Sequence, residues 1–132
     1  GKANQVRAGG DVTLVACGLM VAAALEAAHD LEDQGISARV LDMHTIKPVD
    51  ADAIEQAARQ TGAIVTIEEH LLQGGLGAAV ARVVVERHPV PVAFVGIQDR
   101  YAESGSPQKL LEKYGLMPAD IVQAARHVLE KT

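Results

Sequence analysis

Short apolar runs alternate along the chain with longer segments whose apolar residues recur at helical spacing, and this alternation restricts the fold more than any other feature. The apolar runs, preceded by a short extended segment in NQVRAG, cover residues 11–18, 38–43, 63–70 and 92–97. The segments with helical spacing cover residues 19–34, 51–60, 76–87, 107–113 and 118–131. Such alternation indicates βαβ units, in which a mainly parallel sheet carries helices on both faces. The sequence therefore predicts a single α/β domain over residues 1–132.

The ends of several predicted elements carry residues that stop or start regular structure. Gly35 and Gly62 follow helical segments, where glycine readily adopts the left-handed conformation that closes a helix. Pro48 prevents the second long strand from continuing, because proline lacks the N–H that a sheet ladder needs. Either Asp50 or Asp52 can cap the next helix, since an aspartate side chain accepts hydrogen bonds from the N–H groups of a first turn.

The composition argues against several classes of function. Aromatic residues make up 2% of the 132 residues and the net charge is −5. Proteins that bind single-stranded nucleic acid need aromatic stacking platforms and basic grooves, so nucleic acid is not an expected partner. No apolar run approaches the ~20 residues that span a bilayer, so no membrane segment is expected.

Cys17 is the single cysteine of the chain. A lone cysteine forms no disulfide framework, which favours a reducing, intracellular compartment and hence a cytoplasmic location. We expect its side chain to fill a small space in the core, because no Cys–His arrangement is visible. The chain begins at Gly1 rather than at Met, and we therefore expect it to be a fragment or a processed chain.

The stretch IEEHLLQGGLGAAVARVV raises the question of a phosphate site, because its glycines open a helix directly after a strand. A dinucleotide-binding fingerprint would follow the first strand of its unit and would end in Gly or Ala, whereas Gly75-x-Gly77 is followed by Val80. Glu68 and Glu69 lie just upstream, where their charges would repel an anion at the helix N-terminus. We therefore expect the glycines to permit left-handed backbone or a close approach of helix to sheet.

The acidic residues and histidines do not have the spacing of an acid/base pair or a metal site. Glu68 and Glu69 are neighbours on a strand, so their side chains point to opposite faces of the sheet. The histidines lack H-E-x-x-H or a similar metal-binding spacing; they are His29, His44, His70, His88 and His127. The sequence therefore predicts no catalytic, cofactor-binding or metal-ligating residue on this chain.

The sequence does offer a candidate ligand or domain-docking edge where the predicted strands end. Ligands of α/β domains bind outside the carboxyl ends of the strands. Glu69 and His70 end one such strand, and Asp99 and Arg100 begin the polar loop DRYAESGSP after another. The full candidate set is Gly18, His44, Glu69, His70, Gly74, Gly75, Gly77, Asp99 and Arg100.

Three blocks of the sequence resemble the C-terminal domain of the transketolase family. They are DVTLVACGLMVAAALEAAHDLEDQGISARVLDMHTIKPVD, IVTIEEHLLQGGLGAAVARVV and GIQDRYAESGSPQKLLEKYGL. The first two are similar to any member of the superfamily, and the last, through YAESG and EKYGL, is most similar to split, two-chain transketolases. The resemblance implies a three-layer α/β/α sandwich with a mixed five-stranded sheet in the order 1-3-2-4-5, whose first strand, NQVR, is antiparallel.

The resemblance also implies a function. Similar enzymes use thiamine diphosphate and a divalent metal, Mg or Ca, to transfer a two-carbon ketol unit between sugar phosphates, a transferase reaction of pentose phosphate metabolism. In those enzymes the cofactor lies on a diphosphate-binding and a pyrimidine-binding domain, and we find neither in these residues. The resemblance therefore implies a structural and assembly domain that is inactive alone and belongs to a homodimeric enzyme.

Two alternatives remain open at this point. The chain could be the C-terminal domain of a 2-oxo acid dehydrogenase β subunit, and only the YAESG…EKYGL segment argues against this. It could also be an independent module that binds an anion or a nucleotide, because one fold hosts many functions.

Overall fold

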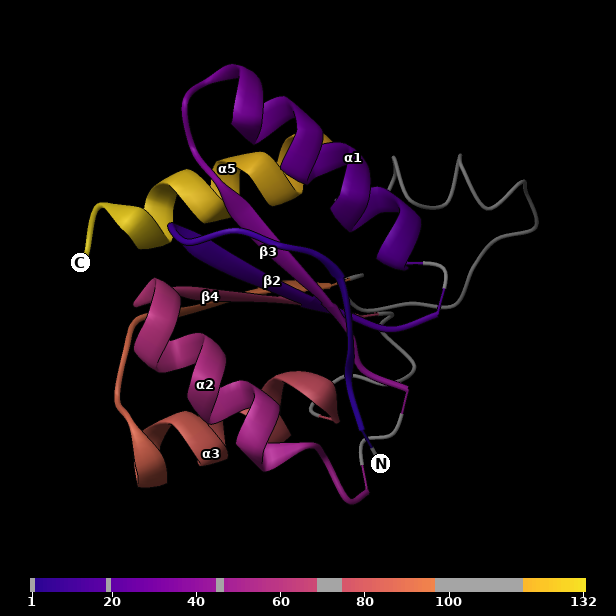
Figure 1. Ribbon diagram of the computed structural model, residues 1–132, viewed down its shortest axis with the longest axis vertical. Helices are drawn as coiled ribbons and strands as arrows, with labels where there is room; N and C mark the ends of the chain where they lie inside the picture. Colours follow the sequence, from indigo (N-terminus) through magenta and orange to yellow (C-terminus); the bar gives the residue numbers. More distant parts are fainter. Residues whose placement is uncertain (1, 19, 45–46, 69–74, 97–117) are drawn as a thin grey trace.

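The computed structural model describes residues 2–18, 20–44, 47–68, 75–96 and 118–132 (Figure 1). Its five strands form one sheet in the order β1-β3-β2-β4-β5. β1 pairs antiparallel with β3, and every other neighbouring pair is parallel. The strands are β1 (Asn4–Arg7), β2 (Val12–Ala16), β3 (Ala38–Asp42), β4 (Ile64–Glu68) and β5 (Val92–Gly96). The expected strand order and the antiparallel first strand are confirmed.

Helices cover both faces of the sheet and complete a three-layer sandwich (Figure 1). α1 and α5 lie on one face, and α2 and α3 lie on the other. The helices are α1 (Met20–Asp33), α2 (Ala51–Thr61), α3 (Leu76–Arg87) and α5 (Pro118–Leu129). None of the described helices is long and apolar enough to cross a membrane.

The core consists of small and medium aliphatic side chains in two layers. β2 and β4 are buried along their whole length at the centre of the sheet. On the α1 side, the alanines of α1 allow the helix to approach the sheet closely; they are Ala23, Ala24, Ala27 and Ala28. On the α2 and α3 side, branched residues such as Ile54 and Val80 fill the space. Cys17 is half-buried against this second layer, as expected for a small core-filling residue.

The helix and strand ends agree with most of the sequence-based predictions. Gly35 and Gly62 have φ angles of 81° and 76°, as expected for residues that close helices. Asp50, not Asp52, caps α2, because its carboxylate accepts a hydrogen bond from the N–H of Ala53 at 3.1 Å. The predicted helix over 107–113 lies outside the described residues.

The order of the strands creates a switch point between β2 and β4. The chain leaves β2 through α1 toward β3, and it returns through α2 to β4 on the other side of β2. The connections therefore diverge onto opposite faces at the carboxyl ends of these two central strands. Because β2 to β5 are parallel, the segments that follow them emerge at the same edge of the sheet.

Candidate functional site

The described residues of the candidate set all follow the carboxyl ends of parallel strands. Gly18 comes after β2 and His44 after β3, while Gly75 and Gly77 lie at the start of α3. This part of the set therefore gathers at one edge of the sheet, as the strand directions require. The other members, Glu69, His70, Gly74, Asp99 and Arg100, lie outside the described residues.

The carboxylate of Glu68 occupies the N-terminus of α3. Oε1 of Glu68 accepts a hydrogen bond from the N–H of Leu76 at 3.0 Å, and Oε2 accepts one from Gly77 at 2.7 Å. The Glu68 residue is only 7% exposed. The first N–H groups of a helix have no partner within the helix, and the helix dipole favours a negative charge beside them. The last residue of β4 therefore acts as a remote cap for α3.

Gly77 allows the close approach that this cap requires. A Cβ atom at this position would lie 2.8 Å from Cδ1 of Phe94 and 3.0 Å from Oε2 of Glu68. The expectation of close helix-to-sheet packing is therefore confirmed at Gly77. The expectation of left-handed backbone is wrong at Gly75, whose φ of −77° lies in the right-handed region.

The Glu68 carboxylate at the N-terminus of α3 affects which ligands this edge can bind. A free helix N-terminus attracts phosphate because its N–H groups point outward. Here two of those groups are bound to a carboxylate of the same chain, which also places a negative charge where a phosphate would sit. The start of α3 is therefore a structural junction between strand and helix, and it is not built as a phosphate cradle.

On the β2 and β3 side of this edge, the described residues Gly18 and His44 are exposed. Gly18 adopts a φ of 61°, which turns the chain from β2 into α1. His44 is exposed, and its Nε2 lies 2.9 Å from the side-chain nitrogen of Asn4. Its Nδ1 lies 3.6 Å from Oδ1 of Asp42. His44 therefore links the first residue of β1 to the end of β3, a contact between neighbouring strands.

Asp50 joins the beginning of the chain to α2. Its Oδ2 accepts a hydrogen bond from the N–H of Ala3 at 2.8 Å, while Oδ1 caps Ala53. The hydrogen bond from Ala3 is the main reason why the pKa of Asp50 lies below its usual value of about 3.8. The carboxylate is thus held in its charged form by two backbone donors.

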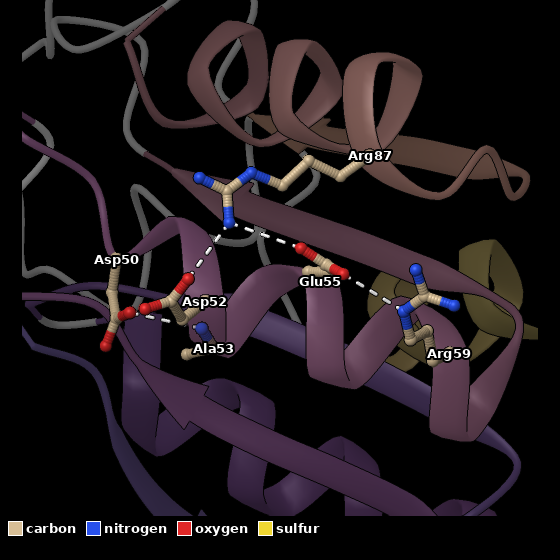
Figure 2. Close-up of polar contacts among 6 residues, drawn as sticks. All are labelled: Asp50, Asp52, Ala53, Glu55, Arg59 and Arg87. Atoms are coloured by element: carbon tan, nitrogen blue, oxygen red, sulfur yellow. Dashed lines mark hydrogen bonds and ion pairs between the residues drawn. The ribbon is translucent and has the colours of Figure 1, made fainter.

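A charged network on the surface connects α2 to α3 (Figure 2). Arg87 of α3 contacts Asp52 at 2.9 Å and Glu55 at 3.2 Å, and Glu55 also pairs with Arg59 at 3.0 Å. Hydrogen bonding from Arg59 lowers the pKa of Glu55, and hydrogen bonds to Asp52 and Glu55 raise the pKa of Arg87. Because all four side chains are accessible to solvent, the network contributes modestly to stability.

The remaining histidines and acidic residues do not converge on a further centre within the described part of the chain. His29 and His127 are exposed on helix surfaces, as expected. Among the described residues, no group of three or more His, Cys, Asp or Glu side chains could hold a metal ion.

The role of Glu68 is the feature of this edge that the sequence did not reveal. From the sequence, we consider Glu68 only as a charge that would repel an anion. In the structure, the Glu68 carboxylate is itself the anion bound at the N-terminus of α3. A signal was present, because the residue at the helix start, Gly75, has no side chain that could cap. The first N–H groups of a helix without a local cap need another acceptor, which is water, a ligand or a side chain from elsewhere in the chain.

Comparisons with known proteins agree with this fold. The family model described as "Transketolase, C-terminal domain" matches residues 1–121. A 6-deoxy-6-sulfo-D-fructose transketolase subunit of Clostridium sp. strain MSTE9 is 49% identical over 131 residues, which cover 99% of this chain and 41% of that protein. An apulose-4-phosphate transketolase subunit of Phocaeicola vulgatus is 44% identical, with 99% of this chain and 42% of that protein covered.

A solved structure shows the same architecture. It is a split-gene transketolase, described as an inactive beta4 tetramer, and it matches with a TM-score of 0.91 and 51% sequence identity. The match covers 98% of this chain and 42% of that chain. The chain thus spans about two-fifths of the length of these relatives.

Proposed function

This chain belongs to the family of transketolase C-terminal domains, and we propose that it serves as the structural and assembly domain of a transketolase-type enzyme. The observation that carries the proposal is the end-to-end match to about two-fifths of transketolase subunits from split enzymes. These relatives support a transketolase over both alternatives, a 2-oxo acid dehydrogenase subunit and an independent binding module. We propose a cytoplasmic location for the enzyme.

The proposed enzyme transfers a two-carbon ketol unit between sugar phosphates. Thiamine diphosphate, with a divalent metal such as Mg or Ca, would supply the carbanion chemistry when bound to the other domains. We assign no step of that reaction to this chain. Its proposed partners are the pyrimidine-binding and diphosphate-binding domains, in an enzyme that is a homodimer as a whole.

The geometry of the α3 junction supports an assembly role. Glu68 fills the helix N-terminus that would otherwise be the natural place for a diphosphate at this edge. Gly18 and His44 remain exposed at the same edge. We propose that the candidate edge, including the residues beyond the described ones, contacts a neighbouring domain or a regulatory ligand and does no chemistry itself.

A domain replacement tests this proposal. The matching region of the Clostridium subunit, 49% identical, is replaced by the 132-residue chain and combined with its partner subunit, thiamine diphosphate and magnesium. We expect assembly and a kcat within about tenfold of the unaltered subunit, because the reacting groups lie elsewhere. If the hybrid assembles but its kcat falls about a thousandfold, this domain takes part in the chemistry.

A thermal-shift titration separates the assembly domain from an independent module. The chain alone is titrated with thiamine diphosphate and magnesium, and separately with inorganic phosphate, ribose 5-phosphate and ADP. A ligand at about 100 times its Kd would stabilise the chain by about 2.7 kcal/mol, a shift of several degrees. We expect no ligand to raise the melting temperature in a saturable way. A saturable rise with phosphate or ADP would favour an independent binding module.

A further inference from the structure

The two edge strands of the sheet are attached to it in different ways. β5, with the uncharged sequence VAFVG, pairs with β4 in regular register along its whole length. β1 has only four residues, and its register to β3 shifts between Gln5 and Arg7. No residue of β1 is fully buried, and Val6 is 43% exposed. Strands that bury little apolar surface open at low free energy, so β1 depends on its polar contacts to stay attached.

The polar contacts at the end of β1 hold it weakly. Nη2 of Arg7 contacts Oε1 of Glu32 on α1 at 2.7 Å, but the Glu32 side chain is 64% exposed, and solvent-exposed ion pairs contribute little. Nε of Arg7 is buried and has no hydrogen-bond partner among the described residues. A buried donor without an acceptor favours the open state, in which water can reach it. Arg7 therefore adds little to the attachment of β1.

The start of β1 has a stronger contact, near His44 of the candidate edge. The N–H of Ala3 donates to Oδ2 of Asp50 at 2.8 Å in a partly buried place. Because the acceptor is a carboxylate, this hydrogen bond is stronger than one between neutral groups. Asn4 adds an exposed contact, with its side-chain nitrogen 2.9 Å from Nε2 of His44. The first residues of β1 thus cover polar groups of two residues, Asp50 and His44, that follow β3.

The chain that follows β1 is fixed to the start of β3. Gly9 lies so close to β3 that a Cβ atom there would come within 2.3 Å of the backbone of Ala38. Its carbonyl oxygen accepts a hydrogen bond from Nε of Arg39 at 3.1 Å. The N–H of Asp11 donates to the carbonyl oxygen of Ser37 at 2.8 Å, and its Oδ2 accepts from the N–H of Ser37 at 2.7 Å. Movement of β1 can therefore stop at Gly9 and leave the rest of the sheet in place.

We propose that β1 is a strap that opens and closes while the rest of the domain stays folded, and that the carboxylate of Asp50 is the latch that keeps it closed. Opening breaks the hydrogen bond from Ala3, frees Nε2 of His44 and uncovers the backbone edge of β3. A hydrogen-bond donor that binds Asp50 competes with Ala3, so binding at this edge is linked to the opening of β1. The strap follows from contacts within this chain and goes beyond the proposed function.

Amide hydrogen exchange of the 132-residue chain, followed by NMR, tests the strap. The amides that hydrogen-bond between β1 and β3 should exchange at least about a hundredfold faster than those between β2 and β4, because the central strands open only when the whole domain unfolds. The amides between β4 and β5 should exchange at least about tenfold slower than those of β1, which separates a strap from the ordinary fraying of an edge strand. A low concentration of urea should leave the exchange of β1 unchanged, since local opening exposes little surface.

Two substitutions at Ala3 test the latch. Ala3→Pro removes the N–H that Asp50 accepts, whereas Ala3→Val keeps it beside a side chain of similar size. We expect Ala3→Pro to raise the exchange of the β1–β3 amides about fivefold, as the loss of one hydrogen bond predicts, and Ala3→Val to leave it unchanged. Asp50→Ala should give a similar rise and also expose the first turn of α2, whereas Asp52→Ala, in the same turn, should leave β1 unchanged. Because Ala3→Pro and Asp50→Ala remove the same hydrogen bond, the double variant should add nothing further at β1.

Either part of the proposal can be overturned. β1 is not a strap if its amides exchange as slowly as those of β2 and β4, or if β5 exchanges as fast as β1. Asp50 is not the latch if Ala3→Pro and Ala3→Val act alike, if Asp52→Ala matches Asp50→Ala, or if the double variant shows the full sum of the two effects. These measurements need neither assembly nor transferase activity, so the proposed function can fail or succeed separately.

Discussion

Helices α2 and α3 lie on the same face of the sheet, yet their first turns are satisfied in different ways (Figure 1). α2 begins directly after Asp50, whose half-buried carboxylate caps Ala53 three residues ahead. α3 begins directly after Gly75, which has no side chain, and its cap is the buried carboxylate of Glu68 from the preceding strand. A local cap stabilises one helix end. A remote cap also fixes how a strand and a helix sit relative to each other.

The largest expected effect comes from removing the remote cap. Glu68→Ala leaves two N–H groups of α3 without an acceptor in a buried place, so we expect the free energy of unfolding to fall by about 2–3 kcal/mol. For a chain of this length the midpoint Tm should fall by roughly 10 °C. Urea denaturation and thermal melts followed by circular dichroism measure both quantities.

Glu68→Gln is the matched control for that change. It keeps one acceptor oxygen of nearly the same size and position, so about half of the loss should remain. If Glu68→Ala destabilised the chain less than Asp50→Ala, the remote cap would not be the stronger of the two.

A second change crowds the same junction. Gly77→Val places a Cβ within 2.8 Å of Phe94 and 3.0 Å of the Glu68 carboxylate, so we expect a loss of about 2 kcal/mol from displaced contacts. Since both substitutions disturb the same hydrogen bonds, the double variant with Glu68→Ala should lose less than the sum. Gly75→Ala, at right-handed backbone, should change stability by less than about 1 kcal/mol.

Strict additivity of Gly77→Val and Glu68→Ala would show that the glycine acts independently of the cap. A loss at Gly75→Ala as large as that at Gly77→Val would contradict the distinction between these two glycines.

The local cap of α2 should have a smaller effect that depends on pH. Asp50→Ala should lower the free energy of unfolding by about 1 kcal/mol at pH 7. Because the folded chain lowers the pKa of Asp50, the contribution is fully present above the unfolded pKa near 3.8 and is lost as pH falls through the folded value. Thermal melts of both proteins from pH 7 downward measure the difference, which should shrink below about pH 4. If the difference between the two proteins stays constant into strong acid, the loss of stability in Asp50→Ala comes from packing and not from the charge of Asp50.

The smallest effect belongs to the surface network between the two helices. Arg87→Ala removes the contacts to Asp52 and Glu55, but solvent screens these charges, so Tm should fall by no more than about 2 °C. The shift should diminish further in about 1 M salt, where the Debye length is short. A larger shift that salt does not reduce would mean that the arginine stem packs between α2 and α3.

Much of the fold could be predicted because it depends on periodicity and on residues close in the chain. The alternation of apolar runs and helical segments located every described element, and Gly35 and Gly62 ended helices as expected. The strand order was predicted from the family resemblance, because periodicity alone does not indicate which strands are neighbours. The candidate edge was predicted by the rule that ligand sites follow strand ends, and Gly18, His44, Gly75 and Gly77 do lie there.

The parts that could not be predicted depend on how elements pack. Both aspartates before α2 were equally suitable as caps, and packing separated them: Asp50 caps the helix and holds Ala3, whereas Asp52 reaches Arg87 on α3. Gly75 has right-handed backbone where left-handed backbone was expected, and the cap of α3 comes from Glu68 on the preceding strand.

The sequence by itself determined the class of fold and the order of its elements along the chain, because these depend on the spacing of residues. The tertiary structure alone decided that Glu68 closes α3, that Gly77 must remain small, and that β5 is left as an uncharged edge beside α5. Each of these features arises between elements. Its geometry is set when strands and helices pack, and the spacing of residues does not specify that geometry.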